Sequence, residues 1–385
     1  MKPAMMAFAA AALLTTACQD EAYRNGNGEH FSVRVVNPDP VFDSREHPDP
    51  AVSVIGNLGR GIFFADGRIA LLDETTLLFI DLATGELLRT AGGGGDGPGE
   101  FRATGPALRW YNSGGDLGIW DALSMRLTVF SSIGELVDVR TLPAASRENA
   151  AAWRRGPGPY FSPAGMFSDG AMVFSEFPQS GSKARPLIGI MEADWEGGLR
   201  TIVNVPADQS SSVLFGYRTY AVIADDQLIV ADTETDSISV HGRGGERLFS
   251  LEMPGEGTRV TDALVEEALA AARSRDEGSL RVRLGFPAAE REYVPNEVVP
   301  PIDRILVDSD ERLWVRSYRL PGDEVQRWTV WRGIDRLFAV EMPTDWLLFD
   351  ASGDLVLLRH TDELGVHSAA VRRMERQRPE GDTEL

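Results

Sequence analysis

The sequence is poor in cysteine and in positive charge. Cys18 is the one cysteine among 385 residues, so no disulfide can form within the chain. Asp and Glu number 58 against 38 Lys and Arg, which gives a formal net charge of −20. A surface of this sign repels polyanions, which argues against nucleic acid as a partner. The 43% of hydrophobic residues is typical of a packed globular protein, and the length suffices for a large core or two domains.

Common catalytic and nucleotide-binding signatures are also missing. No G-x-S-x-G elbow surrounds a serine, and the five histidines show no metal-ligand spacing. The glycine-rich stretch 92–101, GGGGDGPGEF, lacks the Lys and the Ser or Thr of a P-loop. Pro98 and Gly99 oppose the helix that a dinucleotide fingerprint requires. We therefore expect Gly97-Pro98-Gly99-Glu100-Phe101 to be a structural connection between strands.

The N-terminus carries an export pattern. Lys2 supplies a positive charge, and Met5 to Leu14 is an apolar run too short to span a bilayer comfortably. Thr15-Thr16-Ala17 then leads to Cys18. This resembles a bacterial lipoprotein signal, although Thr15 stands where Leu is usual. The alternative is an ordinary secretory signal with an incidental cysteine.

The resemblance to a lipoprotein signal has three implications. Residues 1–17 would be a signal peptide, Cys18 would carry a diacylglyceryl group, and the polar residues 18–30 would form a tether. Gln19 follows the cysteine in place of the Asp that favours inner-membrane retention. The expected location is therefore the bacterial cell envelope, with the outer membrane as the site of a lipid anchor. No later segment has the length and apolarity of a membrane-spanning helix.

A strand pattern repeats along the rest of the chain. Each repeat begins with an apolar strand and a turn, which carries Asp or Gly in five of the six repeats. An alternating apolar strand such as ADGRIALLD (65–73) and two further strands follow. Aligned on the first apolar residue of that strand, the repeats are anchored at Ile69, Leu117, Met172, Leu228, Leu313 and Leu355. Four short strands with a period of about 40 to 55 residues are typical of propeller blades. The pattern predicts an all-β fold, a six-bladed β-propeller over residues 31–376, followed by a polar tail at 377–385.

The last repeat lacks its fourth strand. After the anchor at Leu355 the chain has one more apolar strand, 365–374, and then turns polar. A ring left open there would expose two unpaired edges. The N-terminal segment HFSVRVVN (30–37) alternates apolar and polar residues, and AVSVIG (51–56) is a second candidate. We expect one of them to complete the last blade as an N-terminal strand.

The motif GDGPGEF, placed after the strand GELLRT, resembles a signature of bacterial six-bladed β-propeller lipoproteins related to NHL-repeat propellers. The blade pattern DGRIALLD…FIDLATGELLRTAG resembles the same family, and the similarity covers roughly residues 31 to 375. It implies the fold and leaves activity open, because most members have no established biochemical activity. The long hairpin FPQSGSKARP and the insertion at 254–300 depart from the family pattern.

Chain direction puts two kinds of connection on one face of such a ring: the fourth-to-first-strand loops and the second-to-third-strand loops. This loop-rich face collects 92–101, 143–160, 206–216 and the insertion 254–300, and long loops on a rigid scaffold often carry function. The insertion predicts a helix capped by Thr261 or Asp262, with Leu264, Ala268, Leu269 and Ala272 on one side. This helix would be either a lid over the central opening or a permanent cover of a blade.

Two groups of side chains are candidate ligand-binding residues. Trp153, Arg154 and Arg155 form an aromatic and basic cluster suited to a sugar or an anion. Carboxylates end the second strand of four repeats, at Asp73, Asp121, Glu176 and Asp232. Such a ring offers oxygen ligands to Ca²⁺, while the alternative is that each carboxylate caps a turn in its own blade.

Two functions remain open. The first is a non-enzymatic binding or scaffolding module for a protein or carbohydrate ligand. It would be monomeric, would need no cofactor, and would touch the membrane only through its lipid. The second is a metal-dependent hydrolase or lyase of the lactonase type, which would need an axial cluster of Glu, Asp and Asn. Asn112, Asn149, Asn204 and Asn296 are the candidate asparagines beyond the N-terminal arm, and none occupies an obvious repeat position.

Replacing Cys18 with Ser is expected to abolish lipidation, because the thiol that receives the diacylglyceryl group is gone. The variant should keep its signal segment and lose detergent-dependent membrane association, as judged by fractionation and by intact mass. Thr16→Ser, which keeps a small residue beside the cleavage point, is the control. A Cys18→Ser protein as processed and as membrane-bound as the wild type would show that the motif is incidental.

Overall fold

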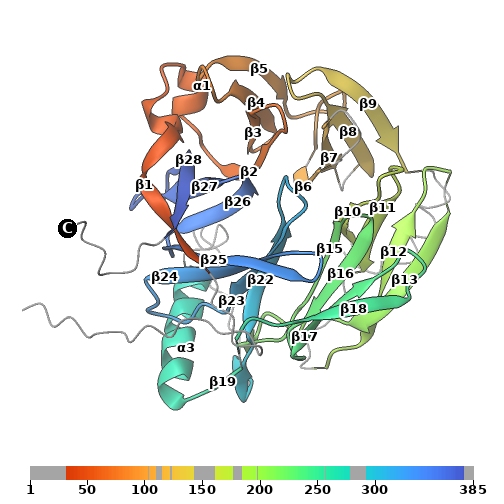
Figure 1. Cartoon of the computed structure of the whole chain (residues 1–385), viewed down its shortest axis with the longest axis vertical. Coiled ribbons are helices and arrows are strands. Elements are labelled where there is room, and N and C mark those ends of the chain that lie inside the picture. Colours follow the sequence, from red (N-terminus) through yellow and green to blue (C-terminus); the bar gives the residue numbers. More distant parts are fainter. Residues whose placement is uncertain are drawn as a thin grey trace, which may run out of the picture.

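The computed structural model describes residues 32–102, 104–109, 115–121, 124–142, 161–176, 184–196, 198–255, 257–277 and 292–376. Over these residues the fold is all-β, with the sheets set around a centre like the blades of a propeller (Figure 1). Within the described chain, no helix has the length and apolarity needed to cross a membrane.

Four of the sheets are four-stranded antiparallel meanders in which each strand pairs with the next along the chain. The first comprises β2 (Leu58–Phe63), β3 (Arg68–Asp73), β4 (Thr76–Asp81) and β5 (Leu87–Gly92). The second comprises β6 (Thr104–Arg109), β7 (Leu117–Asp121), β8 (Arg126–Phe130) and β9 (Leu136–Thr141). The third comprises β10 (Phe161–Met166), β11 (Met172–Glu176), β12 (Leu187–Ala193) and β13 (Leu199–Pro206). The fourth comprises β15 (Thr219–Ala224), β16 (Gln227–Asp232), β17 (Ser237–His241) and β18 (Arg247–Glu252).

The remaining large sheet has eight strands, where the sequence predicted two separate blades. One half is β22 (Ile302–Val307), β23 (Leu313–Ser317), β24 (Val325–Arg332) and β25 (Asp335–Pro343). The other half is β26 (Trp346–Ser352), β27 (Leu355–Thr361), β28 (His367–Arg376) and β1 (Val33–Asp43). The halves join because β1 pairs in parallel with β25 through Val33↔Ala339 to Val35↔Glu341.

The N-terminal arm completes the last set of strands, as the sequence predicted. β1 runs antiparallel to β28 from Arg34↔Arg376 to Asp43↔Ala370, with two register shifts. The second candidate segment does not form a strand. Residues Pro50–Ser53 are a short helix, α1, because Pro50 occupies the first turn and the Asp49 carboxylate accepts the N–H of Ala51 at 2.9 Å. A turn of 3-10 helix, η1 (Ser44–Glu46), links β1 to this segment.

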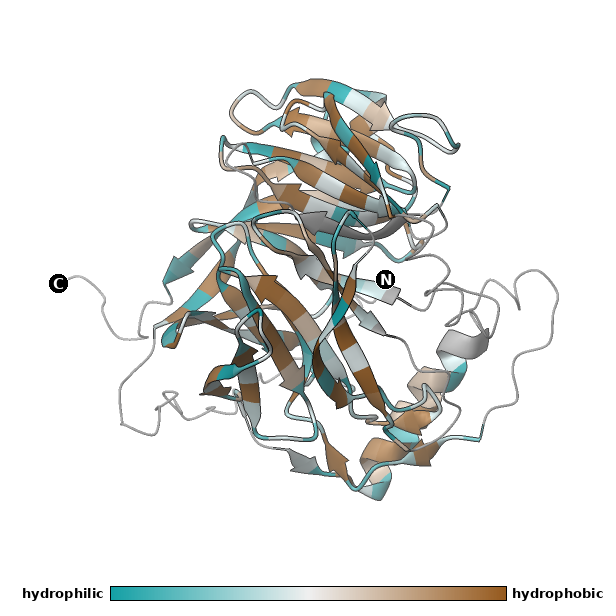
Figure 2. Ribbon diagram, turned by 90° about the vertical axis from the view of Figure 1, so that its right-hand side faces the viewer, coloured by the Kyte–Doolittle hydropathy of each residue, from teal (hydrophilic) through white to brown (hydrophobic). Residues whose placement is uncertain are grey.

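The core lies between successive sheets. β3 and β4 are buried through their four central residues because both faces of their sheet are covered by neighbours. The outer strand β9 exposes Leu136, Val137 and Val139. Figure 2 shows the same division, with hydrophobic residues concentrated in the strands and hydrophilic ones at the turns. The sheets are therefore held face to face by apolar contacts across each interface.

The insertion forms a small unit of its own. Its helix α3 (Asp262–Glu277) begins where predicted, and the Thr261 Oγ1 accepts the N–H of Leu264 at 3.3 Å. The helix packs through a cluster that includes Leu214, Phe215 and Val299, joined by the predicted apolar side of the helix. Two short ladders, β14 (Val213–Leu214) with β20 (Val294–Pro295) and β19 (Thr258–Arg259) with β21 (Val298–Val299), hold the unit. In Figure 1, α3 lies at the rim of the ring and away from its centre.

Deleting residues 31–56 is expected to abolish cooperative unfolding, because it removes the strand that pairs with both β25 and β28. Denaturant titration followed by tryptophan fluorescence measures this. Deletion of the polar tail 377–385 is the control and should leave the midpoint unchanged. An arm-deleted protein that unfolds in one transition at the wild-type midpoint would contradict the pairing.

Candidate ligand-binding site

A cavity of about 390 Å³ lies where the first strands of the sheets converge. Its wall is drawn from five of these strands: β2, β10, β15, β22 and β26. Around the centre, contacts join β26 to β2, β2 to β6, β6 to β10, β10 to β15 and β15 to β22. The cavity is therefore axial, and its size is at the lower end of the range for small-molecule sites.

The convergence depends on small residues in the first strands. A Cβ on Gly61 of β2 would lie 2.7 Å from Cδ2 of Leu357 and 3.1 Å from Cδ2 of Phe349. A larger residue there would have to displace both side chains, so glycine lets β2 lie close to β26 and β27. The apolar part of the wall includes Ile62, Val222, Ile305, Val307 and Phe349.

The mouth of the cavity is acidic. Ser168, Asp225, Asp226 and Glu311 line it, all at connections between a first and a second strand. The Asp226 carboxylate accepts the N–H of Ser168 at 2.6 Å, and Glu311 accepts the N–H of Asp225 at 3.1 Å. These bonds tie neighbouring sheets together across the mouth. The opening therefore lies on the face of the tight turns, opposite the loop-rich face that the sequence favoured for binding.

The inner end of the cavity is basic. Arg60 of β2 lines it, and Arg304 of β22 immediately precedes the lining residue Ile305. Arg304 pairs across the sheet with Arg316. Burial, followed by the positive charges of Arg60 and Arg316, lowers the pKa of Arg304 to about 10, so the guanidinium remains protonated at neutral pH. Arg60 thus brings a positive charge to the axial cavity of a protein of net charge −20.

Two of the carboxylates that end the second strands, Asp73 and Asp121, bind donors beside their own strands. Asp73 accepts the N–H groups of Gly56 at 3.2 Å and Asn57 at 2.6 Å. Asp121, fully buried, accepts the N–H of Arg102 at 3.0 Å and the hydroxyl of Ser124 at 2.7 Å. In these two the carboxylate oxygens are engaged by backbone and hydroxyl donors, which is the geometry of a cap and does not suit Ca²⁺.

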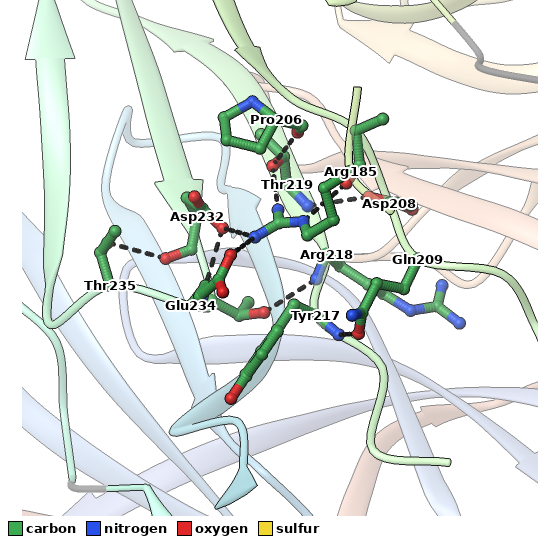
Figure 3. A network of polar contacts seen from close by, with 12 residues as sticks. Arg185, Pro206, Asp208, Gln209, Tyr217, Arg218, Thr219, Asp232, Glu234 and Thr235 are labelled. Atoms are coloured by element: carbon green, nitrogen blue, oxygen red, sulfur yellow. Dashed lines mark hydrogen bonds and ion pairs between the residues drawn. The ribbon is translucent and has the colours of Figure 1, made fainter. Parts of the chain in front are cut away.

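Asp232 belongs to a network that ties the third sheet to the fourth (Figure 3). Its carboxylate lies 2.6 Å from Nη1 of Arg185, which also contacts Glu234 at 2.8 Å. Arg185 Nη2 donates to Thr219 Oγ1 at 2.9 Å and its Nε to the carbonyl of Ala207 at 2.7 Å. Arg185, whose side chain is 6% exposed, therefore links the third sheet to the fourth through buried polar contacts.

Asp208 lies beside Arg185 in this network (Figure 3). Its Oδ1 accepts the N–H of Thr219 at 2.8 Å. Burial raises its pKa above the ordinary value, and the Thr219 bond and the charges of Arg218 and Arg185 only partly oppose that shift. Neither Arg185 nor Asp208 was singled out from the sequence, because their partners come from the next sheet.

The connection 92–101 has a structural role, because it places Phe101 in the core between two sheets. Phe101 is fully buried and meets the ring of Phe130 at 6.2 Å between centroids, in the core between the first and second sheets. Glu100 accepts the N–H of Gly97 at 2.8 Å, and Asp96 pairs with Arg102. Gly99 has the positive φ expected for glycine, +82°, whereas Gly97 does not. At Gly97 a Cβ would lie 2.9 Å from Oε2 of Glu100, so a larger residue would shift the carboxylate that accepts the N–H of Gly97.

Several residues chosen from the sequence lie outside the described part of the chain. These are Cys18, Trp153, Arg154 and Arg155, so their roles remain predictions. The backbone of Glu176 is described as the end of β11, paired with Phe161, while its side chain is outside the description. Among the described residues, no three His, Cys, Asp or Glu gather in a way that would hold a metal ion.

No family model matches the chain, and no curated protein matches it. Among solved structures it is similar to a protein described as a putative exported protein from Bacteroides fragilis, with 11% identity over 84% of this chain and 92% of that one, at a TM-score of 0.48. A member of the DUF4221 family from Bacteroides vulgatus has 9% identity over 90% and 97% of the two chains, at 0.47. A calcium-binding protein, regucalcin, from Agrobacterium tumefaciens has 11% identity over 90% and 97%, at 0.41. Similarities at this level assign neither a family nor an activity to the chain.

Phe101→Ala is expected to lower the free energy of unfolding by about 3–5 kcal/mol, because it leaves a cavity between two sheets. Phe101→Leu, which refills most of that volume, is the matched control and should lose less of the free energy of unfolding.

Glu100→Gln should lower the free energy of unfolding by about 1 kcal/mol, the value of a single hydrogen bond. Denaturant midpoints with and without Ca²⁺ measure these effects. A stable Phe101→Ala protein together with a Ca²⁺-dependent loss at Glu100→Gln would instead make this connection a metal site.

Proposed function

We propose that the protein is a six-bladed β-propeller of the cell envelope that binds a small ligand in its axial cavity. The six-bladed interpretation counts the eight-stranded sheet as two blades joined by β1. Six apolar clusters of the described chain support it, each shared by two successive sets of strands, including β22–β25 with β26–β28 and β26–β28 with β2–β5. The clusters close a circle, as a ring of six blades requires.

The envelope location rests on the N-terminal pattern. Lipidation of Cys18 would leave residues 18–30 as a tether between the membrane and β1, and 13 residues span at most roughly 45 Å when extended. A tether of this length would let the ring stand clear of an outer-membrane surface while the lipid alone contacts the bilayer. The resemblance of residues 31–375 to bacterial propeller lipoproteins also supports a location in the cell envelope.

The axial cavity is the observation that carries the binding proposal. It combines an apolar wall with a few charged groups at its two ends, which is the usual composition of a ligand site. The lactonase-type alternative requires oxygen ligands gathered at the axis. Arg60 lies at the inner end, and at the mouth Asp226 and Glu311 accept backbone N–H groups of Ser168 and Asp225. The described second-strand carboxylates are likewise engaged, Asp73 and Asp121 by backbone N–H groups and Asp232 by Arg185. These contacts favour a binding module over a metal-dependent hydrolase or lyase.

Filling the cavity tests the proposal. Ala221→Phe places a large side chain on a lining strand, while Ala83→Phe places the same side chain on an exposed turn as the control. Thermal unfolding is measured against a panel of organic acids, amines and neutral amides of similar size. The wild type and Ala83→Phe should be stabilised by at least one class, and Ala221→Phe by none. Equal shifts in all three proteins would place binding elsewhere, and loss of the shift on adding EDTA would favour the metal-dependent alternative.

A further inference from the structure

The strands that form the wall of the axial cavity each have one edge without a neighbouring strand. β2, β10 and β15 are end strands of four-stranded sheets, and β22 and β26 are the two end strands of the eight-stranded sheet. In an antiparallel ladder, alternate residues direct their N–H and C=O groups to the partner strand, and the residues between them direct both groups away. These strands therefore present backbone donors and acceptors to the axis.

The register of β15 identifies which of its residues face the axis. The N–H of Thr219 donates to Asp208 Oδ1 at 2.8 Å, so the backbone of Thr219 is directed away from β16. The pairing of β15 with β16 has no register shift, and Ala221 and Ile223 lie two and four residues further on. Their N–H and C=O groups are therefore directed away from β16 as well. Both residues line the axial cavity.

The same reasoning applies to β2 and β22. In β2 the N–H of Phe63 donates to Asp350 Oδ2 at 2.7 Å, and Gly61 lies two residues earlier with no register shift between them. In β22 the N–H of Asp308 donates across the turn that leads to β23 at 3.0 Å. Ile305 lies three residues earlier, so its backbone groups are directed away from β23. Gly61 and Ile305 also line the cavity.

Protein groups bind the backbone at the turn end of these strands but not at the level of the cavity. The carbonyl of Phe63 accepts the hydroxyl of Ser309 at 3.1 Å, and the carbonyl of Ala351 accepts the N–H of Ser309 at 3.1 Å. Four lining residues have axis-facing backbone groups without a hydrogen-bond partner among the described residues: Gly61, Ala221, Ile223 and Ile305. Gly61 and Ile305 are buried, and buried backbone groups need a partner from the protein, from water or from a ligand.

We propose that the axial cavity binds a neutral ligand that carries a secondary amide on an apolar body, and that the axis-facing backbone groups bind the amide. The amide carbonyl accepts an N–H and the amide N–H donates to a C=O, as between two strands of a sheet. Ala221 and Ile223 repeat these groups about every 7 Å along β15, which is the repeat of an extended peptide-like chain. This inference rests on the proposed function and specifies the class of ligand.

The distribution of charge in the cavity also favours a neutral amide. Charged side chains lie at the two ends, whereas the wall between them includes Ile62, Val222 and Phe349. An ionised group beside this wall would lose hydration without gaining an opposite charge. An amide instead offers one donor and one acceptor, which matches the N–H and C=O groups of the strand edges, and its apolar body contacts the side chains.

The first test compares two probes of nearly the same shape. N-benzylacetamide has an N–H where benzyl acetate has an ester oxygen, and binding of each to the wild type is measured by calorimetry and by ligand-observed NMR. The amide should bind at least tenfold more tightly, because the ester lacks the donor and turns an oxygen towards the backbone carbonyls. A cavity that binds through apolar contacts alone would instead favour the more hydrophobic ester.

Proline substitution removes one backbone donor from the cavity. Ala221→Pro lacks the N–H that faces the axis, and the ladder with β16 is kept because that N–H takes no part in it. Amide binding should weaken about five- to tenfold, the effect of one hydrogen bond.

The matched control is Ser250→Pro, on the outer edge strand β18 of the same sheet. Ser250 is exposed and lies three residues before Met253, whose N–H donates to the carbonyl of Asp236 at 2.9 Å. The N–H of Ser250 is therefore directed away from β17, as that of Ala221 is directed away from β16. Ser250→Pro should bind N-benzylacetamide as the wild type does.

The outcomes separate this inference from the function beneath it. An ester that binds as tightly as the amide would overturn the backbone pairing and leave a cavity that binds by apolar contact. An unchanged amide affinity in Ala221→Pro would also overturn it. If acids or amines bind in the cavity and amides do not, the inference fails while the proposed function stands; if no class binds, the function itself fails. If Ala221→Pro does not fold, the wild-type comparison of amide with ester still decides the question.

Discussion

The pairing of β1 with two strands that lie far away in the sequence holds the ring together. β1 extends its neighbour β28 in an antiparallel ladder and meets β25 in a parallel one. Its side chains enter two cores, with Phe42 in the cluster shared with the first sheet and Val36 in the cluster shared with β22–β25. The Ser44 hydroxyl, directly after β1, accepts the N–H of Ala369 at 3.0 Å. The strand thus covers an edge that would otherwise be unpaired and couples the two ends of the chain.

The axial cavity is a consequence of that closure. First strands converge on an axis only when the ring is complete, and close approaches such as that of Gly61 to Leu357 fix how near they come. Hydrogen bonds between turns of neighbouring sheets, such as Ser168 to Asp226, hold the mouth. Arg185 and its partners hold the opposite end of the same interface. The groups that line the cavity are therefore held by contacts between blades.

Local pattern was sufficient to predict much of this fold from the sequence. Alternation and turn residues located the strands, the polar-apolar arm indicated the closing strand, Thr261 marked the start of α3, and Phe101 was expected between blades. The parallel ladder between β1 and β25 was not predicted, because its register depends on contacts some 300 residues apart in the chain. Arg185 was missed for a similar reason, since Thr219, Asp232 and Glu234 come from the next sheet. The cavity was missed because Arg60, Val222 and Ile305 look like ordinary strand residues, and only the ring places them together.

Hydrogen exchange of the backbone amides in β1 is the most direct measurement of ring closure. If closure by β1 is required for the whole structure, its amides and those of β28 will exchange only through global unfolding, with the same free energy as the buried strands β3 and β7. The outer strand β9, which pairs with β8 alone, gives the comparison for a strand that can open locally. Exchange from β1 as fast as from β9, with β28 still protected, would contradict the account, because the arm would then be a peripheral addition to a ring that is stable without it.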